Sequence, residues 1–155
     1  MKNHWGMKFY NLAESKGIKS RIERMVNGWI ETTIFSEKKY FTKSATYNLS
    51  RRQFFQGVDP PKLNDSGDFV LICGGARNNL SDIFIIPWGM FFKTLQKGEP
   101  INTYKPPKEY FQYKFYLRDR DDHWLMSVQG GGRPVLDVSG WYYDISKALK
   151  FIESA

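Results

Sequence analysis

The sequence is poor in the residues that build disulfides and soft-metal sites. It contains one cysteine, Cys73, and two histidines, His4 and His123. One thiol cannot close an internal disulfide or supply a multi-thiolate zinc site, and neither histidine has a second histidine or cysteine close to it in sequence. Because Cys73 ends the apolar run 69–73, we expect a buried and inert thiol. The sequence therefore predicts no metal site.

Long apolar segments are also missing. The first six residues contain no continuous apolar stretch of secretory length, and no later run approaches the roughly 20 residues that cross a membrane. Together with the single thiol, this composition predicts a cytoplasmic protein without a membrane partner.

The usual motifs of phosphate loops and nucleophilic catalysis do not occur. There is no Gly-x-Ser-x-Gly elbow, and the glycine run 130–132 lacks both the Gly-x-Gly-x-x-Gly spacing and a Walker lysine. We therefore predict no cofactor and no catalytic residue. One alternative stays open, a Mg²⁺-dependent restriction-type nuclease. Its candidate carboxylates are Asp68, Asp82, Asp119, Asp121 and Asp122.

Positive charge is present in excess, and its distribution along the chain is uneven. Residues 1–62 hold 12 Lys/Arg against 5 Asp/Glu, whereas residues 63–155 hold 11 of each, so the whole net charge of +7 belongs to the first part. We call these the basic half and the neutral half. A clustered cationic surface attracts polyanions, and this asymmetry predicts a nucleic acid as partner.

Aromatic residues, 17% of the chain, occur in short alternating runs that favour strands over helices. We predict a single α+β domain over residues 1–155, either a twisted antiparallel sheet or a partly closed β-barrel. An amphipathic helix is expected within 12–30, where Ile18, Ile22, Met25 and Trp29 recur at helical spacing, and a closing helix at 146–153. Two hairpins are expected, at 29–43 and 110–128, and a pair of buried strands at 68–73 and 83–86.

Cations and rings alternate in the second part of the basic half. Lysine and arginine can hold phosphates there while neighbouring rings stack on bases, and arginine and glutamine can pair with purine edges. Loops around Arg52-Gln53 and 77–79 are the expected base contacts. The predicted nucleic-acid-binding residues are Lys16, Lys19, Lys38, Lys39, Lys43, Tyr47, Arg51, Arg52, Gln53, Arg77, Asn78 and Asn79.

Three further aromatic residues form a candidate base pocket. If the loop 77–79 meets Trp88, Trp141 and Tyr142 at one mouth of the fold, rings and amide donors would surround an everted base. The competing interpretation is that these rings fill the core.

One sequence pattern runs through the second part of the chain: a strand and a turn, a second strand that ends in Ile86-Pro87, and a last strand that ends in Asp137-Val138-Ser139. It lies in the segments 68–75, 82–88 and 136–139. The pattern resembles accessory or specificity domains of prokaryotic restriction-modification proteins and extends over about half of the chain. The resemblance implies a DNA-reading barrel without catalytic groups, which delivers a nuclease or ATPase partner to its target.

The sequence thus predicts a non-catalytic DNA-binding domain of a restriction or defence system. RNA is not excluded as the ligand, because stacking rings do not distinguish the two sugars. The Mg²⁺-dependent nuclease and a protein-interaction module, whose basic face meets an acidic protein, are the alternatives.

Overall fold

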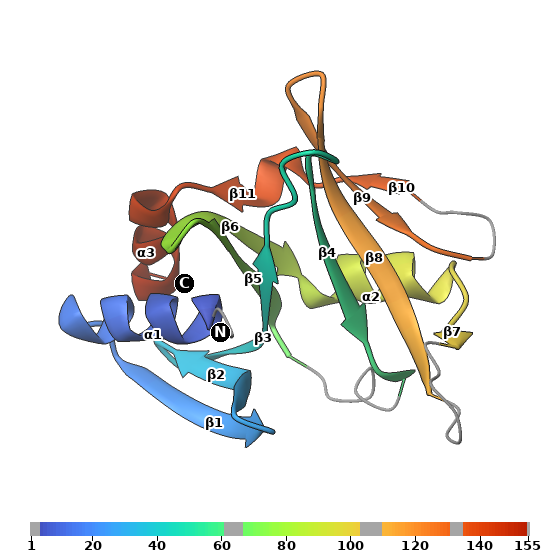
Figure 1. The fold of residues 1–155 in the computed structure, drawn as a ribbon. Helices are drawn as coiled ribbons and strands as arrows, with labels where there is room; N and C mark the ends of the chain where they lie inside the picture. Colours follow the sequence, from blue (N-terminus) through green and yellow to red (C-terminus); the bar gives the residue numbers. More distant parts are fainter. Residues whose placement is uncertain (1–3, 61–66, 103–109, 131–134, 155) are drawn as a thin grey trace.

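The computed structural model of the chain describes residues 4–60, 67–102, 110–130 and 135–154. Within them, two mostly antiparallel sheets pack face to face, and two helices cover the far face of one sheet (Figure 1). We name the sheets A and B. The strand order is β1-β2-β3-β5-β6-β11 in sheet A and β10-β9-β8-β4 in sheet B, where β7 also pairs with β8.

The strands of sheet A are β1 (Ser20–Val26), β2 (Trp29–Phe35), β3 (Lys38–Thr46), β5 (Phe69–Ala76), β6 (Asn79–Pro87) and β11 (Tyr142–Tyr143). Those of sheet B are β4 (Gln53–Val58), β7 (Ile101–Asn102), β8 (Phe111–Arg120), β9 (His123–Val128) and β10 (Val135–Asp137). The helices are α1 (Trp5–Ser15), α2 (Trp88–Gln96), α3 (Ile145–Ser154) and the 3₁₀ turn η2 (Ser139–Trp141).

Sheet A separates two apolar clusters because its central strands are apolar on both faces. On β5, Val70 and Ile72 face sheet B, whereas Leu71 and Cys73 face α1 and α3. A strand that is buried on both faces reads as a continuous apolar run, which is why the sequence shows no alternation there. Cys73 is buried, as expected.

The helices on sheet A bury one stripe each. Trp5, Phe9 and Ala13 recur every four residues on α1 and are fully covered, and α3 contributes Ala148 and Ile152 to the same cluster. No helix of the described residues is long and apolar enough to cross a membrane.

The α+β class with helices near both ends of the chain is confirmed, and so are both hairpins, the β5–β6 pair and the closing helix. The described strands form two open sheets and no closed barrel, so the partly closed barrel is not confirmed.

The predicted position of the first helix is wrong. The chain is helical only to Ser15, Gly17 then adopts φ of 78°, and Ser20–Val26 forms an edge strand. Of the residues that suggested a helical stripe, Ile18 precedes β1, Ile22 and Met25 lie in β1, and Trp29 begins β2; Met25 is 45% exposed. The spacing of four, three and four residues matched a helical repeat by chance, and the pairing of β1 with β2 selects the extended conformation.

The charge boundary does not divide the fold. β3 from the basic half pairs in parallel with β5 from the neutral half, and β4 pairs with β8. Both halves therefore contribute to each sheet.

Candidate functional site

The predicted phosphate-binding cations lie in three separate places. Lys38 and Lys39 begin β3, and Lys19 lies beside the same turn because its carbonyl accepts a hydrogen bond from the Ser36 N–H. Arg51 and Arg52 follow the other end of β3. At about 3.3 Å per residue β3 spans roughly 26 Å, so the two groups lie at opposite ends of a long strand. Lys43 lies between them on β3.

Acidic side chains accompany the lysines of the first group. Lys19 Nζ lies 3.3 Å from Glu37 Oε1, and Lys39 Nζ lies 3.1 Å from Glu23 Oε1. The hydrogen bond from Lys39 is the main reason that the pKa of Glu23 is lowered. These pairs reduce the positive potential at this end of the molecule, where Lys16 follows α1.

The second group is enlarged by two arginines from the neutral half. Arg120 donates from Nη1 to the Arg52 carbonyl (3.2 Å) and from Nη2 to the Arg51 carbonyl (3.1 Å). Arg118 Nε donates to Gln53 Oε1 at 3.0 Å. The four arginines and Gln53 surround a hollow of about 430 Å³. We call this group, Arg51, Arg52, Arg118 and Arg120, the arginine cluster.

Local backbone chemistry explains why the two strands present these side chains together. The Asn48 side chain accepts hydrogen bonds from the Arg51 N–H and the Ser50 hydroxyl, which closes a tight turn. Arg52 then takes φ of 52°, and Gln53 pairs with Arg118 across the β4–β8 register. Among the ion pairs of the described residues, one acid contacts the cluster, since Asp119 Oδ1 lies 3.4 Å from Arg52 Nη2.

Sequence reasoning missed Arg118 and Arg120 as site residues because they belong to the neutral half. The signal that could have found them is the alternation of β8, which places Lys114, Tyr116 and Arg118 opposite the buried Phe115 and Leu117.

Of the remaining predicted contacts, Tyr47 adjoins the arginine cluster, because its hydroxyl interacts with the Arg52 side chain and, after Asp119, helps to raise the pKa of Arg52. The Tyr47 ring packs on Phe54 at 5.1 Å, at the edge of the core. The others lie elsewhere. Arg77 and Asn78 form the β5–β6 turn with positive φ, and Asn79 begins β6. This turn lies beside α1, because Lys8 Nζ donates to the Asn78 carbonyl at 3.1 Å.

The candidate base pocket is not assembled. Trp88 begins α2 at the Pro87 end of β6, whereas the 77–79 loop lies at the Asn79 end. The Trp88 ring packs near Phe41, with centroids 5.8 Å apart.

Trp141 and Tyr142 also pack on the core between the sheets. The Tyr142 ring stacks on Trp124 at 5.3 Å, and its hydroxyl donates to Asp82 Oδ1 at 2.5 Å. Core packing therefore accounts for these rings.

The carboxylates proposed for a nuclease are also dispersed. Asp68 Oδ2 accepts a hydrogen bond from the Lys39 N–H at 2.8 Å. Asp82 accepts a hydrogen bond from the Tyr142 hydroxyl, and Asp119 forms an ion pair with Arg52. Asp121 and Asp122 form the β8–β9 turn with positive φ. Across the described ranges, no three His, Cys, Asp or Glu side chains are grouped so that they could hold a metal ion.

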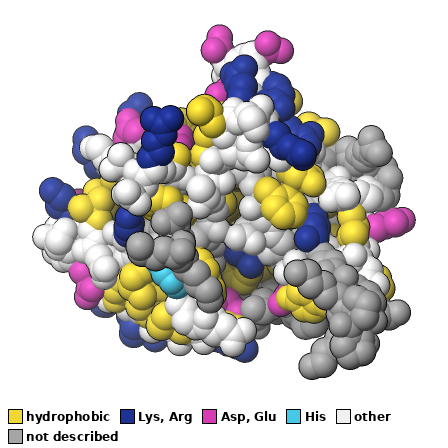
Figure 2. Space-filling view, viewed as in Figure 1, with side chains coloured by type: hydrophobic (Ala, Val, Ile, Leu, Met, Phe, Trp, Pro, Cys, Tyr) yellow, Lys and Arg dark blue, Asp and Glu magenta, His cyan; other side chains and the backbone are white. Residues whose placement is uncertain are grey.

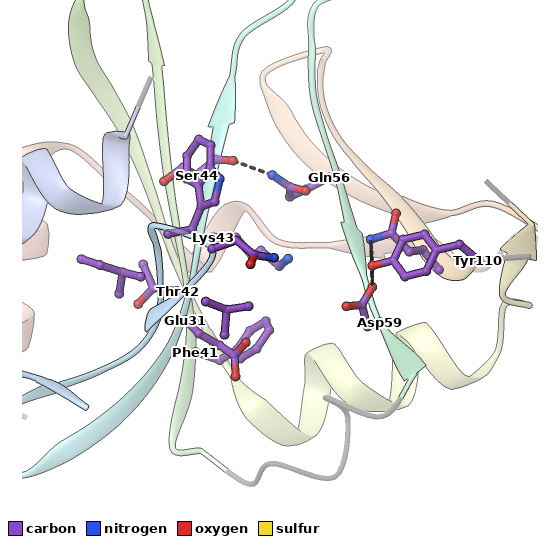
Figure 3. A pocket seen from close by; sticks show the side chains of 13 residues that line it. Glu31, Phe41, Thr42, Lys43, Ser44, Gln56, Asp59 and Tyr110 are labelled. Atoms are coloured by element: carbon purple, nitrogen blue, oxygen red, sulfur yellow. Dashed lines mark hydrogen bonds between the residues drawn. The ribbon is translucent and has the colours of Figure 1, made fainter. Parts of the chain in front are cut away.

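A different set of charged residues meets in a cleft between the two sheets (Figure 3). The cleft measures about 570 Å³ and is lined by β2 and β3 on one side and by β4 and the start of β8 on the other. Glu31 comes from β2, Lys43 from β3, and Asp59 from the residues that follow β4. The Lys43 side chain extends from β3 into the space in front of β4.

A bulge places Glu31 in this cleft. Thr32 pairs with Arg24 and Ile30 with Met25, so Glu31 is an extra residue that shifts the alternation of β2. Ile30 consequently faces the helices, while the Glu31 side chain, only 4% exposed, lines the cleft with Arg24 Nε 3.4 Å from its Oε1. Alternation alone could not have located it.

The other wall of the cleft is held by hydrogen bonds. Asp59 Oδ1 accepts from the Tyr110 hydroxyl and, at 3.0 Å, from Gln112 Nε2. Burial, together with the hydrogen bond and negative charge of Asp59, raises the pKa of Tyr110 to about 12. The Gln56 amide donates to the Ser44 carbonyl at 2.6 Å and ties β4 to β3.

No family model, curated protein or solved structure matches this chain. The resemblance to specificity domains of restriction-modification proteins therefore stays a prediction.

Proposed function

We propose that the protein binds nucleic acid without cleaving it and that the arginine cluster holds the phosphates. The observation that supports this most directly is that four arginines line one hollow. Arginine is suited to phosphate because its planar fork donates two parallel hydrogen bonds. The cluster joins cations from both halves of the chain.

The cluster is partly preorganised for this role. Arg120 is held by the main-chain carbonyls of Arg51, Arg52 and Asp119, and Arg118 is held by Gln53, so their geometry is set before a ligand arrives. Preorganised donors lose less side-chain entropy on binding. Arg51 is exposed at the rim, where a phosphate can reach it.

DNA is the ligand we propose, with RNA as the other nucleic acid of the same chemistry. The resemblance to restriction-modification proteins adds the proposal that a nuclease or ATPase partner acts on the bound DNA. A complex with an acidic protein would use the same charges, and a pull-down that resists nuclease digestion would favour it.

The test is the affinity for a fluorescent DNA oligonucleotide, measured by anisotropy over a range of salt concentrations. We expect affinity to fall steeply with salt, because bound phosphates release counterions. Arg51→Ala and Arg118→Ala should each weaken binding by about tenfold and reduce the salt slope by about one. Lys147→Ala and Lys150→Ala on α3 are the matched controls. Affinity that does not change with salt would rule the proposal out.

The inter-sheet cleft supports a second candidate function, the Mg²⁺-dependent nuclease, at residues other than those expected from sequence. Glu31 and Asp59 are two carboxylates that line the same cleft as Lys43, and metal-assisted phosphodiester hydrolysis uses such a combination. Mg²⁺ is often held by one or two carboxylates, with waters and substrate phosphates completing its shell.

This candidate is tested by incubating plasmid with the protein and Mg²⁺ or Mn²⁺. Nicking that is lost in Lys43→Met and Asp59→Asn, and retained in Asp121→Asn, would support it. Plasmid that stays intact at high protein excess removes it and leaves the binding function alone.

A further inference from the structure

We infer that the outer face of sheet B is a stacking platform for a single strand of nucleic acid. The inference rests on the proposed function and adds the form of the ligand and the surface along which it lies. Helices α1 and α3 cover sheet A, and α2 contributes Phe91 and Leu95 to the cluster between the sheets. In the part of the chain that the structure describes, no helix covers the other face of sheet B (Figure 1).

Two rings stand next to each other on this face. Phe55 on β4 and Tyr116 on β8 are direct cross-strand partners, and their ring centroids are 5.0 Å apart at an angle of 37°. Their sequence neighbours Phe54 and Phe115 point inward and are about 1% exposed, whereas Phe55 is 41% exposed. The exposed Phe55 ring and the half-buried Tyr116 ring together offer flat apolar surface on this face.

A cation flanks each ring. Lys114 Nζ lies 5.1 Å from the centre of the Phe55 ring, and Arg118 Cζ lies 4.6 Å from the centre of the Tyr116 ring. Each ring of the pair thus has a cation over it, and Arg118 is itself a member of the arginine cluster. Figure 2 shows lysine and arginine side chains beside hydrophobic ones on the face of the molecule that carries β4 and β8.

The surface is hollowed beside the rings. A groove of about 660 Å³ runs along β8, β9 and β10 and is lined by Tyr116, Arg118, Gln129 and Val135, among others. It shares Arg118 with the hollow of the arginine cluster, so the two depressions adjoin. The Tyr116 hydroxyl donates to Gln129 Oε1 at 3.1 Å, which fixes the ring at the border of the groove.

These features favour a single strand over a duplex. In a duplex the bases are paired and stacked on each other, so protein rings on a flat sheet cannot reach their faces. In a single strand each base can stack on an exposed ring while the neighbouring cations hold the phosphates. Two acids mark the end of the platform beyond Arg120. Asp121 and Asp122 form the tip of the β8–β9 hairpin there.

The experiment compares the affinity of the full chain for oligo(dT), for oligo(U) and for a duplex of equal length. We expect tighter binding of both single strands, since stacking does not depend on the sugar. Phe55→Leu and Tyr116→Leu should each weaken single-strand binding by about tenfold and leave duplex binding unchanged. Phe55→Trp keeps a stacking surface and should retain the affinity. Phe111→Leu removes a ring that is 46% exposed on β8 but lies outside the pair, and serves as the control.

The outcomes separate this inference from the proposed function. If the leucine variants bind single strands as tightly as the parent while Arg51→Ala binds less tightly, the platform is overturned and the phosphate site stands. Preference for the duplex would also overturn the platform. If no oligonucleotide binds at any salt concentration, the proposed function fails first. The thermal unfolding temperature of each variant is the control for folding. A variant that unfolds at the same temperature as the parent has lost binding without losing its fold.

Discussion

Arg52 and Asp119 form an ion pair between the basic and the neutral half of the chain, with Arg52 Nη2 3.4 Å from Asp119 Oδ1. The hydrogen bond and charge of Asp119 raise the pKa of Arg52. The carboxylate is thus the one acid that contacts the arginine cluster among the described ion pairs, and it opposes the approach of a phosphate.

Removing this charge should strengthen binding. We expect Asp119→Asn to raise the affinity for DNA by about threefold at low salt, because charges at an interface mainly change the association rate. Anisotropy measures the affinity, and stopped-flow mixing measures the association rate. Glu153→Gln on α3 removes one negative charge far from the cluster and is the control. An unchanged or lower affinity for Asp119→Asn would mean that phosphates do not bind beside Arg52.

Two tyrosines, the half-buried Tyr142 and the buried Tyr40, should respond differently to loss of the hydroxyl. Tyr142 donates to Asp82, so Tyr142→Phe should lower the free energy of unfolding by about 1 to 2 kcal/mol. The Tyr40 hydroxyl is buried without a hydrogen-bond partner among the described residues. Tyr40→Phe should therefore be neutral or stabilising by up to about 1 kcal/mol. Urea unfolding of both variants measures the difference, and equal losses would contradict it.

Gly74 should not tolerate a side chain, because its strand lies against an aromatic ring. A Cβ at this position would lie 2.5 Å from Cε1 of the buried Phe54. Gly74→Ala should cost about 1 to 3 kcal/mol through overpacking. Gly89, in the first turn of α2, has nothing within 4 Å of the corresponding position. Gly89→Ala should be neutral or stabilising, because alanine is the better helix former. Thermal unfolding of the two variants provides the comparison.

Stability should fall at alkaline pH. Burial raises the pKa of Cys73, and burial, followed by the hydrogen bond to Asp82 and the charge of Asp82, raises the pKa of Tyr142. Both groups are neutral when protonated, so the fold binds their protons more tightly than the unfolded chain. This contribution is fully present below the unfolded pKa values, about 8.5 for the thiol and 10 for the phenol, and is lost as pH rises above them.

The free energy of unfolding from urea titrations at pH 7, 9 and 10.5 tests this expectation. In Cys73→Ala the loss should begin about 1.5 pH units later, because only the tyrosines remain. A parent protein whose stability is equal at pH 7 and pH 10.5 would contradict the assignment of these buried groups.

Local signals were sufficient for much of the fold. Three kinds of signal act within a few residues: the apolar runs of β5 and β6, the alternation within β8, and the position of Pro87 before α2. The structure confirms the elements that these signals predicted. The first helix was misplaced because Ile18, Ile22 and Met25 match both a helical stripe and an edge strand, and only the pairing of β1 with β2 selects between them.

The candidate sites depended on contacts that sequence reasoning could not supply. The arginine cluster needs the β4–β8 register, and the cleft needs the bulge at Glu31 and the packing of β3 against β4. Asn48 closes the turn that brings Arg51 to the cluster, a side-chain contact that a charge count does not include.

The sequence alone determined the surplus of positive charge, its concentration in residues 1–62, the absence of phosphate-loop motifs and the α+β class. Only the tertiary structure decided which cations share a surface. The burial of Phe54 against Phe115 and Leu117 sets the register of β4 on β8, and that register joins arginines more than 60 residues apart in the chain. Such pairings are set by non-local packing, so charge counted along the chain does not reveal charge gathered in space.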